Sequence, residues 1–169
     1  MSGAEAPWSR LNFEIESRLD AVPLLGQVAY LLCIAAGFAP VEGSQLEVCV
    51  VEAVNNSILH AYQGDPAHRV ELEAQLLSGE LIFDVWDSGT SADPAQMNAD
   101  HRGALEVHSG QVKDIPHTGR GLAIIQEVMD SSEYTPGTER NRFRMIKRRD
   151  LCQLPNERPK RTRQLDHKK

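Results

Sequence analysis

The chain has few cysteines, and none of them stands in a spacing that binds zinc or exchanges disulfides. Cys33, Cys49 and Cys152 are far apart in the sequence, whereas zinc sites and redox motifs place cysteines close together in pairs. Cys33 and Cys49 lie in apolar runs, so we expect buried thiols in a reducing compartment. The histidines are irregularly spaced as well, so no zinc site is expected.

A secretion signal and an uninterrupted membrane-spanning run are also missing. The first ten residues, MSGAEAPWSR, have no charged start followed by an apolar core, so we expect a cytoplasmic protein. Residues 21–41 carry no charge, but Pro23, Gly26 and Gly37 interrupt them. Since a bilayer-spanning helix needs about 20 mostly apolar residues, a buried core helix is the favoured interpretation over a membrane span.

Charge is unevenly distributed along the chain. The last 19 residues hold six basic and two acidic side chains, so they contribute +4 to a net charge of −6 and the rest contributes −10. Nucleic-acid binding depends on clustered cations, so the acidic body argues against direct binding of nucleic acid. The basic tail has few apolar residues and is expected to be disordered, with a docking arm as the less favoured alternative.

The length of the chain limits it to one domain. Domains cluster at roughly 100–150 residues, and the sequence has 169 with no internal repeat. We expect a flexible N-terminus over residues 1–9, one domain over 10–149 and the tail over 150–169.

Hydrophobic periodicity predicts the first half of this domain. Residues 10–17 alternate between apolar and polar, as in a half-buried strand. The uncharged run predicts a helix over 23–36 that ends at Gly37. Ser44 and Glu47 form a capping-box pattern, and the apolar stripe that follows predicts a second helix to about Ala61.

The second half continues with strands and one more helix. Residues 90–118 show no periodicity and are too long for an ordinary connection, so we expect a lid there. The other predicted elements are a hairpin over 70–76 and 81–85, a helix from Gly121, and closing strands at Tyr134 and 141–147. This order predicts an α+β fold, a two-layer sandwich whose helices cover one face of a mixed, mostly antiparallel sheet.

A pair of polar residues lies off the apolar stripe of the second helix. Glu52 and Asn56 are four residues apart, so their side chains share one helix face. A carboxylate can take a proton from a hydroxyl group, and a carboxamide can offer an oxygen to Mg²⁺. Alone, such a pair is usually a solvated helix face.

Two further features favour a functional site over a solvated helix face. Asp87 ends the predicted hairpin, and its carboxylate can accept a hydrogen bond from an exocyclic amine, with Gly89 allowing a flat base to approach. Residues 118–121, Thr-Gly-Arg-Gly, open the last helix, where backbone amides and the positive helix end suit phosphate oxygens. Each feature alone is common in ordinary turns.

Together and in this order, the three features resemble the nucleotide site of the GHKL (Bergerat-fold) superfamily, which includes gyrase, mismatch-repair and histidine-kinase ATPase domains. The resemblance covers about residues 10–148. Residues 52–62, EAVNNSILHAY, are similar to the N-box of the anti-sigma-factor serine/threonine kinases. Residues 86–89 and 119–122 are similar to the first and second glycine boxes of that family.

The resemblance implies a role for each matching residue. Glu52 would be the general base on a substrate serine, Asn56 would hold Mg²⁺ against the phosphates of ATP, and Asp87 would bind the adenine amine. The remaining nucleotide-binding positions would be Gly89, Thr118, Gly119, Arg120 and Gly121. Arg120 would offset charge on the transferring phosphoryl group. Apart from these roles, His60 is expected to cap or pack the helix end, and Tyr62 and Trp86 to line the pocket or core.

The function implied is that of an ATP- and Mg²⁺-dependent protein serine/threonine kinase acting as an anti-sigma factor. It would bind a sigma factor and phosphorylate a STAS-domain anti-anti-sigma protein, and homodimers are common in the family. One alternative is a non-catalytic ATP-binding partner-switch module. Another is a metabolic or DNA-linked ATPase of the same fold, which normally needs a further transducer domain.

Overall fold

The computed structural model describes residues 9–102 and 117–149, with the backbone alone for 117–119. Five strands form a single sheet in the order β1-β2-β3-β5-β4. The strands are β1 (Ser9–Glu16), β2 (Arg69–Leu77), β3 (Glu80–Asp87), β4 (Ser131–Thr135) and β5 (Asn141–Arg148). The helices are α1 (Val22–Ala35), α2 (Pro40–Asn56), the π-helical turn η1 (Ser57–Ala61), α3 (Pro94–Met97) and α4 (His117–Val128). The predicted flexible N-terminus and basic tail lie almost entirely outside the described residues.

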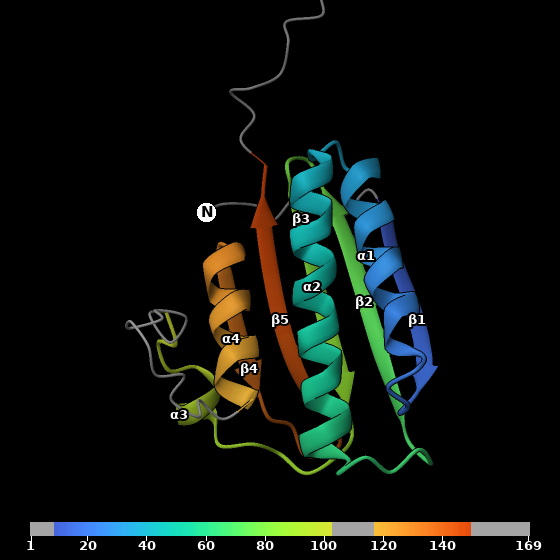
Figure 1. The fold of residues 1–169 in the computed structure, drawn as a ribbon, viewed down its shortest axis with the longest axis vertical. Helices are drawn as coiled ribbons and strands as arrows, with labels where there is room; N and C mark the ends of the chain where they lie inside the picture. The colour runs from blue at the N-terminus through green and yellow to red at the C-terminus, as the bar shows by residue number, and fades with distance from the viewer. Residues whose placement is uncertain (1–8, 103–116, 150–169) are drawn as a thin grey trace, which may run out of the picture.

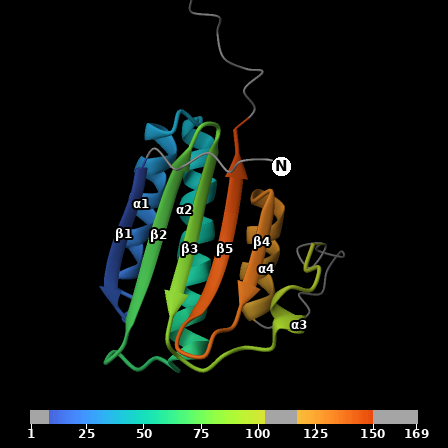
Figure 2. The same ribbon diagram turned by 180° about the vertical axis from the view of Figure 1, so that it is seen from behind.

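The sheet and helices form two layers, as predicted. Helices α1, α2 and α4 cover one face of the sheet (Figure 1), and no helix of the described residues covers the opposite, open face (Figure 2). The sheet was expected to be mixed, but every pairing between the described strands is antiparallel. The reason is that two helices, rather than one, separate β1 from β2, so the chain reverses direction once more than in a parallel crossover.

The helix α2 begins earlier than its sequence signals predicted. Its first residue is Pro40, and the side chain of Glu42 accepts a hydrogen bond from the Ala39 N–H at 2.8 Å. The prediction that Ser44 and Glu47 cap this helix is therefore wrong. Proline at the first helical position has a preset φ and no N–H to satisfy, so the helix starts there and places Ser44 inside its first turns.

The core lies between the helices and the covered face of the sheet. Among its fully buried side chains are Leu46 and Val50 of α2, Leu72 of β2 and Phe83 of β3. Burial of such side chains contributes about 1.5–3 kcal/mol each, the main favourable term in holding the two layers together. None of the helices in the described part of the chain combines the length and the apolar composition needed to cross a bilayer.

The open face of the sheet is covered by charged side chains in cross-strand pairs. Arg144 of β5 contacts Asp84 of β3 at 2.7 Å, and Arg69 of β2 contacts Glu14 of β1 at 2.7 Å. Trp86 also lies on this face, 4.9 Å beneath the guanidinium of Arg140. Its predicted place in the pocket or core is wrong, because strand side chains alternate between faces and its neighbours point toward the helices.

Candidate functional site

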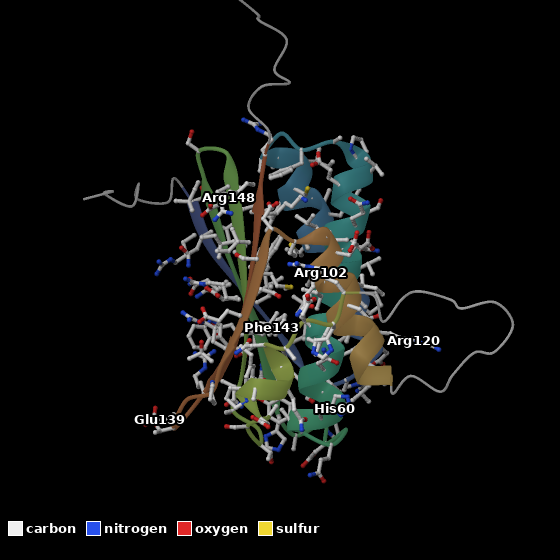
Figure 3. The ribbon with its side chains drawn as sticks, turned by 90° about the vertical axis from the view of Figure 1, so that its left-hand side faces the viewer. His60, Arg102, Arg120, Glu139, Phe143 and Arg148 are labelled. Carbon is white, nitrogen blue, oxygen red and sulfur yellow. The ribbon has the colours of Figure 1, made fainter. Side chains whose placement is uncertain are left out.

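A cavity of about 620 Å³ lies at one end of the molecule, between the helix layer and the sheet. Its walls come from the end of α2, η1, the loop after β3, α3, and single residues of α4, β4 and β5. Leu122 of α4 and Phe143 of β5 are among its apolar walls, and His60 lines it from η1. Figure 3 shows Phe143 on the sheet side and His60 at the lower end of the helix layer.

Asp87 lies at the end of β3 and lines this cavity. Ser57 Oγ donates a hydrogen bond to Asp87 Oδ2 at 3.0 Å. Asn141 Nδ2 donates to Asp87 Oδ1 at 2.8 Å, and the Gly89 N–H donates to the same oxygen at 3.1 Å. The side chains of Asp87, Ser57 and Asn141 are buried, so the carboxylate is held in one orientation at the cavity wall.

Sequence reasoning did not identify Ser57 and Asn141 as site residues. Ser57 matches the helical period of the apolar stripe of the second helix, so its spacing does not single it out as a site residue. Asn141 is the register partner of Asp87 in the β3–β5 pairing. A signal existed for Ser57, since it lies inside the N-box run, but Asn141 becomes visible only once the strand order is known.

The turn η1 shapes the wall next to Asp87. Helix α2 passes at Ser57 into this π-helical turn, a form that is often found at functional sites. Asn56 and His60 line the cavity from either end of the turn. His60 lies in the last turn of η1 and is exposed on the cavity wall, so the expectation that it caps or packs the helix end stays a prediction.

Gly89 has a structural role that the sequence did not predict. A Cβ at this position would collide with the carbonyl group of Ala61, and the neighbouring Thr90 N–H donates to Ala61 O at 2.9 Å. The glycine therefore lets the loop after β3 approach the backbone at the end of η1. The predicted approach of a ligand base to Gly89 stays a prediction.

Glu52 faces helix α4 and is not among the described residues that line the cavity. A Cβ on Gly121 would lie 2.6 Å from Glu52 Oε2, so the carboxylate fits against α4 only because residue 121 has no side chain. Asn56 is one helical turn further along α2. The structure thus brings Glu52, Asn56 and Gly121 to one side of the α2–α4 interface, next to the cavity.

The remaining predicted residues lie in the first turn of α4. This helix begins at His117, four residues before the predicted start, so Thr118 and Gly119 belong to it. Their side-chain environment lies outside the described part of the structure. Arg120 is half-buried at the same end of the helix, and in Figure 3 its side chain points away from the sheet.

About half of the residues predicted to form the lid, 90–118, are described by the structure. Residues 94–97 form α3, and the last two residues begin α4, while 103–116 lie outside the described residues. Asn98 exchanges two hydrogen bonds with the backbone of Tyr134, at 3.0 and 2.7 Å. Gln126 of α4 donates to Ala99 O at 2.7 Å. These contacts hold the segment after β3 against α4 and β4 as a cavity wall.

Tyr134 adds a buried hydroxyl group to this wall. Its oxygen accepts a hydrogen bond from the Ala92 N–H at 3.0 Å. Burial raises the pKa of Tyr134 above its ordinary value, and the nearby charge of Asp87 raises the pKa further. The tyrosine is therefore neutral at physiological pH and supports the loop after β3.

The cavity has the size and chemistry of a nucleotide-base site. Its volume lies within the range of about 300–1,000 Å³ typical of cofactor pockets. Apolar side chains such as Leu122 and Phe143 form much of the wall, and the Asp87 carboxylate provides a fixed acceptor at one edge. Flat apolar walls with one polar edge suit an aromatic base that carries an amine.

Comparison with known proteins agrees with this chemistry. The chain is 30% identical over 99 residues to an anti-sigma F factor of Oceanobacillus iheyensis, a match covering 59% of this chain and 64% of the relative. It is 31% identical over 96 residues to the serine-protein kinase RsbW of Listeria innocua, covering 56% of this chain and 59% of the relative. In both cases the match spans a little under two thirds of the relative's length.

A solved structure shares the fold. The crystal structure of the RsbU and RsbW domains of a Mycobacterium tuberculosis protein superposes with a TM-score of 0.57, covering 85% of this chain and 33% of that one at 15% identity. A family model for the histidine kinase-like ATPase domain matches residues 15–147. Most of the chain is thus covered by one family model and one known fold. The chain belongs to the histidine kinase-like ATPase domain family, and its anti-sigma and RsbW relatives confirm the resemblance to the GHKL anti-sigma kinases.

Proposed function

We propose that this chain is an ATP- and Mg²⁺-dependent protein serine/threonine kinase that acts as an anti-sigma factor. It would bind a sigma factor and phosphorylate a serine of a STAS-domain anti-anti-sigma protein. The main structural support is the fixed Asp87 carboxylate at the edge of an apolar cavity, with Asn56 on the adjoining wall. The names of the relatives, an anti-sigma F factor and a serine-protein kinase, support the class of partner.

Different cavity residues would bind different parts of the nucleotide. Asp87 would accept a hydrogen bond from the adenine amine, and Leu122 and Phe143 would contact the base. Asn56 would offer its side-chain oxygen to Mg²⁺, a cation that prefers oxygen ligands and is commonly shared with substrate phosphates. When bound, Mg²⁺-ATP supplies the phosphoryl group that is transferred.

The second glycine box would contact the phosphates. Thr118, Gly119, Arg120 and Gly121 belong to the first turn and a half of α4. Free backbone amides at a helix N-terminus and the positive end of the helix dipole favour phosphate oxygens. Arg120 would add a positive side chain at this end.

Glu52 would act on the protein substrate. As general base it would take the proton from the serine hydroxyl as that oxygen attacks, a role that requires the carboxylate to reach the hydroxyl group. The Glu52 carboxylate lies beside Gly121, near the proposed phosphate-binding turn at the start of α4. Phosphoryl transfer depends mainly on positioning and electrostatics, so this placement matters more than the acid strength of the group.

The test is phosphate transfer from Mg²⁺-ATP to a purified STAS-domain substrate, followed by mass spectrometry of the phosphoserine. We expect Glu52→Gln to bind ADP as well as the unmodified chain does and to lose transfer by about a hundredfold or more. Glu127→Gln, an exposed substitution on α4, serves as the matched control and should transfer normally. Normal transfer by Glu52→Gln would rule out its role as the base.

One observation favours a second candidate function. Glu52 contacts α4 and is absent from the described residues that line the cavity, as would suit a nucleotide-binding module without catalysis. Such a partner switch would release or hold its regulator according to the nucleotide bound. In that case Glu52→Gln would leave nucleotide-dependent partner binding unchanged and no phosphoserine would form.

A further inference from the structure

Asn141 and Asp87 face each other at the last register position of the β3–β5 pairing. Side chains that are opposite each other in a sheet lie on the same face and interact directly. Here both point into the helix-covered side, where Val85, Phe143 and Met145 continue the two columns as apolar residues. The pair is therefore a polar end to an apolar column, and it lies at the cavity wall.

The amide group of Asn141 can take only one orientation. Nδ2 donates to Asp87 Oδ1 at 2.8 Å and to Gly89 O at 3.1 Å, and both of these atoms are acceptors. Oδ1 accepts from Ser91 Oγ at 2.7 Å. A flipped amide would place its oxygen against a carboxylate and a carbonyl, with no donor between them. Since Asn141 is only 2% exposed, water cannot compensate for a flip.

These hydrogen bonds determine which donors and acceptors the cavity wall presents to a base. A carboxylate has about four acceptor positions. Asp87 Oδ1 accepts from Asn141 and from the Gly89 N–H, and Oδ2 accepts from Ser57. One position on Oδ2 is left. The Ser57 hydroxyl group donates to Asp87 Oδ2, and the Asn141 amide group donates to Asp87 Oδ1 and to Gly89 O. Neither group has a donor left for a ligand, so the Asp87 carboxylate presents an acceptor at this edge.

We infer that Asn141 is a positioning residue that sets the base selectivity of the cavity. By fixing Asp87 and the turn that follows it, Asn141 makes the edge complementary to a base with an exocyclic amine, such as adenine. Hypoxanthine carries a carbonyl oxygen at that position, which would face the remaining carboxylate position and be repelled. The inference rests on the proposed function only in requiring that the cavity binds a purine nucleotide.

Calorimetric titration of the full chain with ADP and with IDP tests this role. Since a hydrogen bond to a charged group changes affinity by about tenfold or more, ADP should bind at least about tenfold more tightly than IDP. Asn141→Ala should weaken ADP binding by about tenfold and IDP binding by about threefold or less, so the ratio of the two affinities falls. Asn12→Ala, on an exposed position of β1, is the matched control and should change neither affinity.

Ser91→Ala keeps the test decisive if Asn141→Ala does not fold. Ser91 is exposed, and its substitution removes the hydroxyl group that donates to Asn141 Oδ1 and also interacts with the Tyr134 hydroxyl group. The ratio of ADP to IDP affinity should fall by about twofold to fivefold. Equal weakening of both nucleotides would mean a merely structural role and would overturn the inference.

The outcomes also separate this inference from the proposed function. Suppose that the unmodified chain transfers phosphate but that both variants keep its ratio of ADP to IDP affinity. Only the selectivity role of Asn141 would then be overturned. A chain that binds neither ADP nor IDP would overturn both. Equal affinity of the unmodified chain for ADP and IDP would also contradict the role of Asn141.

Discussion

The carboxylate of Glu52 lies directly against the α-carbon of Gly121, across the interface between α2 and α4. A Cβ on residue 121 would be 2.6 Å from Glu52 Oε2, while the Cβ and Cδ atoms of Glu52 would be 3.5 Å away. The collision is thus confined to the flexible end of one side chain. The N-box and the second glycine box are connected at this point by a direct steric relationship.

Substituting Gly121→Ala is expected to move this carboxylate without damaging the fold. Alanine favours a helix interior over glycine by roughly 0.5–1 kcal/mol, so thermal stability should not fall. Displacing a catalytic group by about 1 Å can cost about a hundredfold in rate, so phosphate transfer should fall far more steeply than ADP affinity, which also depends on this turn. Steady-state transfer assays with calorimetry on the same variant check this, and undiminished transfer would contradict it.

A second glycine substitution, unlike Gly121→Ala, is expected to lower the stability of the fold. In Gly89→Ala the new methyl group meets the Ala61 backbone, which cannot rotate away. The loop must move and break the hydrogen bond between the Thr90 N–H and Ala61 O. We expect a loss of about 1–3 kcal/mol in the free energy of unfolding, as for other overpacked sites, together with weaker ADP binding.

Gly64→Ala is the control for that experiment. Nothing lies within 4 Å of a Cβ at Gly64, but its φ is +79°. The left-handed backbone alone should cost about 1–2 kcal/mol. ADP affinity should be unchanged, because Gly64 is not among the described residues that line the cavity. Urea unfolding and ADP titration of both glycine variants separate steric collision from backbone strain.

The ion pair between Asp84 and Arg144 is expected to matter far more than the other pairs on the open face of the sheet. Asp84 is 1% exposed and accepts two hydrogen bonds from the Arg144 guanidinium, at 2.8 and 2.7 Å. Arg144→Met would leave a buried carboxylate without a partner, at a cost of about 3 kcal/mol. Arg69→Met, which breaks an exposed pair with Glu14, should cost less than about 1 kcal/mol.

A double variant tests whether the unpaired charge of Asp84 causes the loss of stability in Arg144→Met. If the loss in Arg144→Met comes from an uncompensated charge, then adding Asp84→Leu should restore most of the stability. Chemical denaturation of the two single variants and the double variant completes the cycle. A double variant that is less stable than Arg144→Met would show that packing, and not charge, dominates at this position.

The buried thiols predict how stability depends on pH. Burial raises the pKa of Cys33 and of Cys49 from 9.0 to about 12. Since both groups ionise more readily in the unfolded chain, their contribution to stability is complete below pH 9 and is lost as the pH rises toward 12. The free energy of unfolding should therefore decrease over this range.

The same burial should make these two thiols unreactive in the folded chain. In a Cys152→Ser variant, neither Cys33 nor Cys49 should be modified by a thiol reagent at pH 8 until the chain unfolds, because the thiolate is the reactive form. Rapid labelling under native conditions would contradict the buried placement. Labelling in denaturant provides the control that both thiols are intact.

Local patterns were sufficient for most of the fold. The alternation in β1, in the β2–β3 hairpin and in β5 is a property of neighbouring residues, and so is the stripe of α2. The start of α2 was misplaced because two capping signals lie close together. The pattern at Ser44 looked complete, whereas Pro40 and the Glu42 side chain occupy the true helix start.

The candidate site was only partly predictable. Glu52, Asn56 and Asp87 were named because their residue types suit phosphoryl transfer and base binding and because their order resembles a known family. Their neighbours were not, because the Ser57–Asp87 and Asn141–Asp87 hydrogen bonds join residues 30 and 54 positions apart. The structural role of Gly89 was not predicted for the same reason, since its close neighbour is Ala61 from another element.

The sequence by itself therefore determined the secondary structure and the chemical groups available for a nucleotide site, since periodicity and residue type are local properties. Only the tertiary structure decided which of these groups meet. The antiparallel pairing of β3 with β5 sets Asn141 opposite Asp87, and the approach of α4 to α2 places Gly121 against Glu52. Both contacts depend on the register and packing of distant segments, which no short stretch of the chain encodes.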